Sequence, residues 1–137
     1  MARLRELLDR LRAAGWKPGS PVSLAEVDAA EMRLGCMLPP TYREFLVASG
    51  RANGSASHSW RGLWDVDQLV SLNKSLPLFQ WFEGLIGIGN EGFMVLALNF
   101  REPTCPVVSL GMSCSLWDEV NLEAESFEEW LAGTVES

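Results

Sequence analysis

Three glycines form a G-x-G-x-x-G pattern at residues 87–92, with the sequence GIGNEG. In dinucleotide-binding proteins this pattern opens a helix, whose free N–H groups and dipole hold the pyrophosphate. Here the next six residues, FMVLAL, form an unbroken apolar run that is typical of a strand covered on both faces. We therefore interpret the glycines as turn residues that need a positive φ angle, and we predict no nucleotide cofactor.

Side chains suited to nucleophilic or metal chemistry are few and poorly grouped. His58 is the only histidine, whereas general bases near neutral pH are usually histidines and metal sites commonly use two or more. The cysteines Cys36, Cys105 and Cys114 lack a metal-type spacing, so in a reducing compartment we interpret them as small core residues. The sequence leaves a Cys36–His58 pair open but has no motif that supports it. We predict a protein that is not an enzyme, with no catalytic residues, no metal and no cofactor.

Glu31 is a carboxylate placed among apolar residues. It lies seven residues after Leu24 and three before Leu34, on or beside the apolar face of a helix. A buried carboxylate is costly unless it accepts hydrogen bonds, and the start of the following helix offers free N–H groups between Pro40 and Tyr42. We favour this structural clasp over a functional role for Glu31.

Six tryptophans in 137 residues are the other conspicuous side chains. Trp130 lies at helical spacing from Phe127 and is expected in the core, whereas Trp60, Trp64 and Trp81 flank a polar segment and either fill the core or rim a binding surface. The candidate contacts for a protein partner combine aromatic, acidic and amide side chains: Trp60, Trp64, Asp65, Asp67, Asn90, Glu91, Trp117, Asp118 and Glu119.

The net charge of −7 is distributed unevenly along the chain. Residues 1–20 carry five basic and two acidic side chains, whereas residues 102–137 carry eight acidic side chains and no lysine or arginine. Such an acidic region repels phosphates, which argues against nucleic acid, and it suits a basic protein partner. The alternative is a solvated acidic face that serves only solubility.

Two helices joined by a Gly-x-x-Leu-Pro-Pro corner are predicted between residues 23 and 50. Ser23 and Glu26 form a capping-box pattern, with Leu24 at the start of the apolar stripe, and Gly35 is placed to end the first helix. Proline fits the first turn of the second helix, which presents Tyr42, Phe45 and Leu46 on one face. Leucines at i, i+3, i+4 and i+7 predict an amphipathic helix over residues 2–14, followed by a turn at residues 16–19.

The remaining elements complete an α+β domain. Residues 51–59 read as an exposed loop, residues 60–64 as a short strand, and Asp65 as the cap of a helix. Strands 85–88 and 93–99 form a hairpin around residues 89–92, with further strands at 106–110 and, more weakly, 116–122, and a last helix capped by Ser126. We predict one domain over residues 1–137, with a leading amphipathic helix at 1–16 and a central, mostly antiparallel sheet that has helices packed on one side.

No apolar run approaches the ~20 residues that a membrane helix needs, and the charged N-terminus has no apolar segment typical of a secretory signal. We therefore expect a cytoplasmic protein with no membrane partner.

Several of these positions together resemble the SUKH superfamily. The pattern consists of Glu31, Leu34-Gly35, Leu38-Pro39, Tyr42, Phe45-Leu46 and Gly50, then Ile86 to Asn90 with its Gly89, and finally Ser126 to Leu131. That group contains fungal cell-wall synthesis regulators and many bacterial immunity proteins that neutralise polymorphic toxins. The resemblance implies a non-catalytic, protein-binding domain, first of all an immunity protein against a nuclease or deaminase toxin. The alternative is a regulatory or scaffolding module without a toxin partner. The family supplies no universal contact residues, and the oligomeric state stays open.

Overall fold

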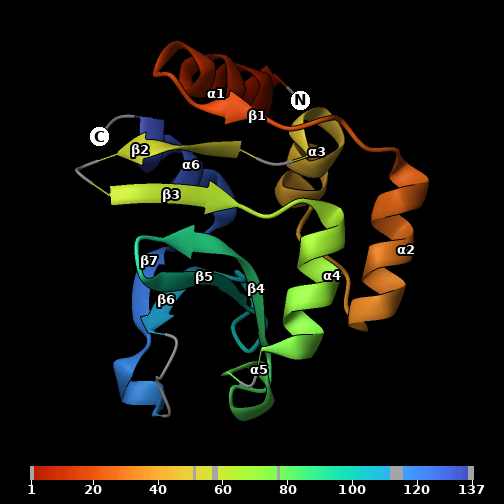
Figure 1. The fold of residues 1–137 in the computed structure, drawn as a ribbon, viewed down its shortest axis with the longest axis vertical. Coiled ribbons are helices and arrows are strands. Elements are labelled where there is room, and N and C mark those ends of the chain that lie inside the picture. Colours follow the sequence, from red (N-terminus) through yellow and green to blue (C-terminus); the bar gives the residue numbers. More distant parts are fainter. Residues whose placement is uncertain (1, 51, 57–58, 77, 112–115, 136–137) are drawn as a thin grey trace.

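The computed structural model describes residues 1–137 except 1, 51, 57–58, 77, 112–115 and 136–137. In chain order its elements are α1 (Ala2–Ala13), β1 (Lys17–Pro18), α2 (Leu24–Leu34), α3 (Pro40–Ser49), β2 (Ala52–Ala56), β3 (Ser59–Leu63), α4 (Val66–Ser75), α5 (Leu78–Trp81), β4 (Leu85–Glu91), β5 (Met94–Asn99), β6 (Val107–Gly111), the 3₁₀ turn η1 (Trp117–Glu119), β7 (Asn121–Ala124) and α6 (Phe127–Val135) (Figure 1). No described helix has the length and apolar character needed to cross a membrane.

The strands pair antiparallel in sequence order from β1 to β7, so that each is bonded to the next along the chain. The β4–β5 hairpin runs from the Leu85–Asn99 pair to the Glu91–Met94 pair, with a register shift between Gly87 and Gly89. The hairpin confirms the prediction, but the predicted four-residue connection was wrong. Residues 89–91 belong to β4, and the strands are joined by Gly92 and Phe93 alone, with φ +58° at Gly92.

Two segments that were predicted as irregular are strands. Residues 52–56 pair with residues 59–63 as the β2–β3 hairpin instead of forming an exposed loop. Lys17 and Pro18 form β1 on the outer side of β2 instead of a turn. The residues of β2, ANGSA, have low strand propensity. A tertiary contact explains why glycine occurs in this strand. Gly54 lies against the ring of Trp16, and a Cβ at this position would come within 2.5 Å of that ring. His58 lies outside the described residues.

The main core lies between one face of the sheet and the helices α1, α3 and α6, and it also takes in Val27 of α2 and Leu69 of α4. The predicted leucine stripe of α1 is buried, as are the predicted apolar faces of α3 and α6. At the centre the ring of Phe127 packs edge-on against Tyr42 at 4.9 Å and Phe45 at 5.5 Å. In α2 the expected stripe holds at Val27, but Leu24 is 59% exposed, so its predicted burial was wrong.

A smaller core covers the other face of the sheet. Along β5, Leu96 and Leu98 point into the main core, whereas Val95 and Ala97 point into the smaller one with Phe82. The absence of alternation in β5 is therefore explained by burial on both faces, as predicted. The α+β class and the antiparallel sheet are confirmed.

Candidate functional site

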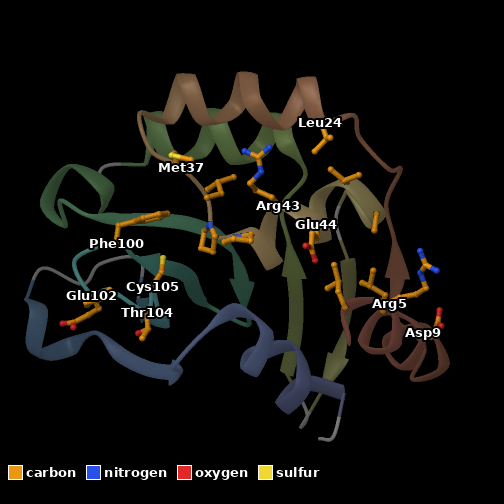
Figure 2. Close-up of a pocket in the computed structure, with 18 of the residues that line it drawn as sticks. Arg5, Asp9, Leu24, Met37, Arg43, Glu44, Phe100, Glu102, Thr104 and Cys105 are labelled. Carbon is orange, nitrogen blue, oxygen red and sulfur yellow. The ribbon is translucent and has the colours of Figure 1, made fainter. Parts of the chain in front are cut away.

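A long groove of 1210 Å³ runs along α3 (Figure 2). Its walls come from α1, from the start of α2, from the α2–α3 connection and from the loop between β5 and β6, and no strand lines it. Figure 2 shows Arg5 and Asp9 at the α1 end, Phe100 and Glu102 at the opposite end, and α3 between them. We call this feature the α3 groove.

Beside the α3 groove, Glu31 ties α2 to the α2–α3 connection. Its Oε2 accepts a hydrogen bond from the Leu38 N–H at 2.6 Å, and its Oε1 accepts one from Arg43. The predicted clasp therefore exists, but its predicted donors between Pro40 and Tyr42 were wrong. Pro39 and Pro40 have no N–H, and the donor is the residue before them.

Arg43 links the buried Glu31 to the exposed Asp28. Its second guanidinium nitrogen donates to Asp28 Oδ1 at 2.8 Å, so that one arginine joins two carboxylates of α2. The hydrogen bond to Asp28, together with the contacts to Glu31, raises the pKa of Arg43 against the effect of desolvation. The charge of Arg43 is therefore already engaged within the protein.

The two described cysteines are poor nucleophiles. Burial, and after it the negative charge of Glu31, raises the pKa of the Cys36 thiol. Burial, and after it the proximity of Cys36, raises the pKa of Cys105 to about 11. Both thiols are therefore protonated at neutral pH. Within the described part of the chain, no group of three or more His, Cys, Asp or Glu side chains is arranged to hold a metal ion.

A second concave feature of 470 Å³, which we call the tryptophan cleft, is lined by Trp81, Glu83, Gly84, Arg101 and Trp117. Trp81 is 71% exposed and Trp117 is 38% exposed. The guanidinium of Arg101 lies 4.5 Å from the Trp117 ring centroid, and the edge of Phe82 supports the same ring at 5.0 Å. Asp118 and Glu119 follow Trp117 in η1 and are exposed. Of the predicted contact residues, Trp117 therefore lines the cleft and its neighbours Asp118 and Glu119 follow it in the chain, while the structure adds Trp81 to this surface.

The other predicted contact residues lie around the β3–α4 junction and the end of β4. Trp64 is buried, and its indole N–H donates to Asn90 Oδ1 at 2.8 Å, so these two side chains bind each other at the edge of the core. Asp65 forms a complete capping box with Gln68, and Asp67 is exposed in the first turn of α4. Two further predicted contact residues lie in the sheet: Trp60 pairs with Ser55, and Glu91 pairs with Arg61. The predicted contact set is therefore split between two regions.

Sequence reasoning missed Asn73, a buried amide on α4. Its Oδ1 accepts from the Gly87 N–H at 2.7 Å, and its Nδ2 donates to Gly87 O at 2.8 Å and to Leu69 O at 2.7 Å. Asn73 thereby satisfies the backbone of β4 where its register shifts. A polar residue four positions after Leu69 on the buried face of α4 was the available signal.

The glycines of the 87–92 pattern are needed mainly for close packing. Among the three, only Gly92 has a positive φ angle. A Cβ at Gly87 would come within 2.4 Å of the Phe79 ring, and one at Gly89 within 2.2 Å of the Gly62 carbonyl oxygen. The interpretation as turn glycines was correct for Gly92 and wrong for the other two.

Comparison with known proteins gives one family. Residues 21–133 match the family described as SMI1 / KNR4 family (SUKH-1). The matched part begins after α1 and β1, and it includes the clasp and the tryptophan cleft. No curated protein matches the chain.

Proposed function

The chain belongs to the SMI1 / KNR4 family (SUKH-1), whose domains have protein-binding roles in immunity or regulation, and from that premise we propose that it is an immunity protein. In this proposal it neutralises a bacterial toxin domain of the nuclease or deaminase type by binding it directly. The domain itself is not an enzyme. The family is generally non-catalytic, and the protonated thiols of Cys36 and Cys105 agree with that role.

The observation that supports this proposal best is the exposed aromatic and acidic surface at the tryptophan cleft. Exposed tryptophans are costly to hydrate and are enriched among the residues that dominate binding energy at interfaces. Trp81 and Trp117 lie beside Glu83, Asp118 and Glu119, while Arg101 is the one basic residue that lines the cleft among the described residues.

A basic toxin domain suits this chemistry. Toxins that act on nucleic acid need a positively charged surface to approach phosphates. Acidic side chains around the two tryptophans would attract such a surface, and the rings would then be buried on contact. A protein seated there would block access of nucleic acid to the toxin.

The test is co-expression of the protein with toxin domains encoded beside it, scored by growth and by co-purification. We expect rescue of growth by the wild type and loss of rescue with the double variant Trp81→Ala, Trp117→Ala, whose affinity should fall by about tenfold or more. Phe93→Ser is the matched control, because Phe93 is 97% exposed at the β4–β5 turn and lies outside the cleft.

Absence of rescue and of co-purification with every such toxin would contradict the proposal. Capture of a housekeeping complex from cells without any toxin would instead favour the regulatory role known among the fungal relatives. Loss of rescue with Phe93→Ser but not with the tryptophan variant would place the contact surface elsewhere.

A further inference from the structure

We propose that the α3 groove is a second docking site, which binds an amphipathic helix of a protein partner with basic side chains at its Glu102 end. The site does not depend on the toxin-binding proposal, because it lies against the other core. Leu4, Leu8 and Leu38 connect the groove to the main core, whereas Trp117 of the tryptophan cleft rests on Phe82 of the smaller core.

Exposed apolar side chains of the groove provide the binding surface. Met37 is 81% exposed and Leu24 is 59% exposed, and both line the groove together with the buried Leu8 and Leu38. Leaving such side chains in water is unfavourable, and burying them on a partner recovers about 25 cal/mol per Å². Methionine is also flexible enough to adapt its shape to a partner side chain.

The shape of the groove favours a helix over a strand or a small molecule. A partner strand would need a free sheet edge, but the lining residues come from helices and loops. The volume of 1210 Å³ exceeds the roughly 300–1,000 Å³ typical of small-molecule pockets. An amphipathic helix fills an elongated apolar groove with residues at i, i+3, i+4 and i+7.

The charged residues of the groove determine which end of the bound helix carries basic side chains and which end carries acidic ones. Arg43 is held by Asp28 and Glu31, and Arg12 lies 3.9 Å from Asp9. Among the described residues, Arg5, Glu44 and Glu102 form no ion pair. Glu102 lies at one end of the groove, Glu44 near its middle and Arg5 at the other end (Figure 2). The matching helix therefore carries basic side chains toward Glu102 and Glu44, and an acidic side chain toward Arg5.

A synthetic peptide of about 16 residues, roughly 24 Å long as a helix, is a suitable probe. It has leucines at i, i+3, i+4 and i+7, lysines flanking one half and glutamates flanking the other. With the 137-residue chain labelled with 15N and at its methionine methyl groups, we expect saturable binding that shifts the Met37 methyl resonance. A spin label at the lysine end should broaden backbone resonances around Glu102 and Thr104 and leave those around Arg5 sharp.

Variants at exposed positions test the site without endangering the fold. Met37→Ser and Leu24→Ser should each weaken peptide binding by about tenfold, while Phe93→Ser, an equally drastic change at a residue outside the groove, should change it less than about twofold. Glu102→Lys should abolish the preferred orientation of the spin-labelled peptide, and the double variant Glu102→Lys, Arg5→Glu should reverse it, because it exchanges the charges at the two ends of the groove.

Three results would overturn the proposal. The first is no saturable binding of the peptide, and the second is equal binding of a scrambled peptide of the same composition. The third is an affinity loss with Phe93→Ser as large as that with Met37→Ser. If the variants at Met37 and Leu24 lose peptide binding but still bind the toxin, the two sites are separate.

Discussion

Glu31 shows how far a single side chain can be understood from the sequence. A carboxylate within an apolar stripe must find donors, so a clasp to the next helix was predictable. Its partners were not predictable, because the choice between the Leu38 N–H and the first turn of α3 depends on how the two prolines direct the chain. Nor did the sequence indicate Arg43, which lies twelve residues away and joins Glu31 to Asp28.

Replacing Glu31 should measure how much the clasp contributes to the free energy of unfolding. We expect Glu31→Ala to lower the free energy of unfolding by about 1–3 kcal/mol, because the buried Leu38 N–H loses its acceptor. Glu31→Gln should cost less, since an amide oxygen still accepts that hydrogen bond. Asp28→Ala is the control on the exposed side of Arg43, with an expected change within about 0.5 kcal/mol. Urea denaturation of the three variants measures these differences, and an unchanged midpoint for Glu31→Ala would contradict the clasp.

The raised pKa of Cys105, about 11, predicts slow alkylation. At pH 8 an ordinary thiol with a pKa of about 8.5 is about one quarter thiolate, whereas Cys105 should be about a thousandth thiolate. We therefore expect Cys105 to react with iodoacetamide about 250-fold more slowly than free cysteine, with a rate that rises about tenfold per pH unit up to pH 10. Peptide mapping by mass spectrometry separates Cys105 from the other cysteines, and a rate equal to that of free cysteine would refute the burial.

The same pKa shift has a consequence for stability. The native state holds the Cys105 proton to higher pH than the unfolded chain does, so this contribution is complete below about pH 8.5 and is lost as pH rises toward 11. In Cys105→Ala that part of the alkaline decline should be absent. Identical alkaline slopes for wild type and variant would show that the thiol is not held protonated.

At the scale of elements, the helices were easier to predict than the sheet. Caps and stops are local signals: Ser23 and Ser126 accept the Glu26 and Glu129 N–H groups, and Gly35 is left-handed, as predicted. The capping box predicted at Ser23 is only half formed, because the described contacts include no hydrogen bond from the Ser23 N–H to the Glu26 side chain. Strand pairing is a long-range property. The β2 sequence alone favours a loop, and only its neighbours β1 and β3 make it a strand. For the same reason the α3 groove was not predicted, since it needs α1, α3 and the β5–β6 loop in place.

The close approach of β3 to β4 can be tested at Gly89. In Gly89→Ala the new Cβ would meet the Gly62 carbonyl oxygen at 2.2 Å, and because backbone cannot move as a side chain does, the strands must separate. We expect a loss of about 2 kcal/mol or more. Gly111→Ala in β6 is the matched control, because no atom of the described residues, chain neighbours aside, lies within 4 Å of its added Cβ, and the stability of this variant should change by less than about 1 kcal/mol. Equal effects of the two substitutions would mean that β3 and β4 are not so closely packed.

At the scale of the whole molecule, the two candidate surfaces differ in how their charges are used. Three charged side chains that line the α3 groove already form ion pairs. Arg12 pairs with Asp9, and Arg43 pairs with two carboxylates of α2. Next to the tryptophan cleft, Asp118 and Glu119 are exposed, and Glu125 is exposed before α6. Glu123 belongs to the same acidic region, but its carboxylate accepts a hydrogen bond from Ser109 Oγ at 2.7 Å and is therefore already used. Long-range attraction of a basic partner should thus come from the first three acids.

Neutralising these three acids tests that attraction. For the triple variant Asp118→Asn, Glu119→Gln, Glu125→Gln we expect slower association with the cognate toxin at low salt. The difference from wild type should shrink as added salt shortens the screening length to ~8 Å. A control that changes the net charge equally at exposed sites outside the predicted contact set, Glu6→Gln, Asp9→Asn, Glu26→Gln, should associate at nearly the wild-type rate. Stopped-flow measurements at low and high salt compare the three proteins.

If both triple variants associate equally slowly, net charge alone governs association, and if neither associates more slowly than wild type, the acids serve only solubility. A loss confined to the first variant would support the acidic side of the tryptophan cleft as the surface that the toxin meets first.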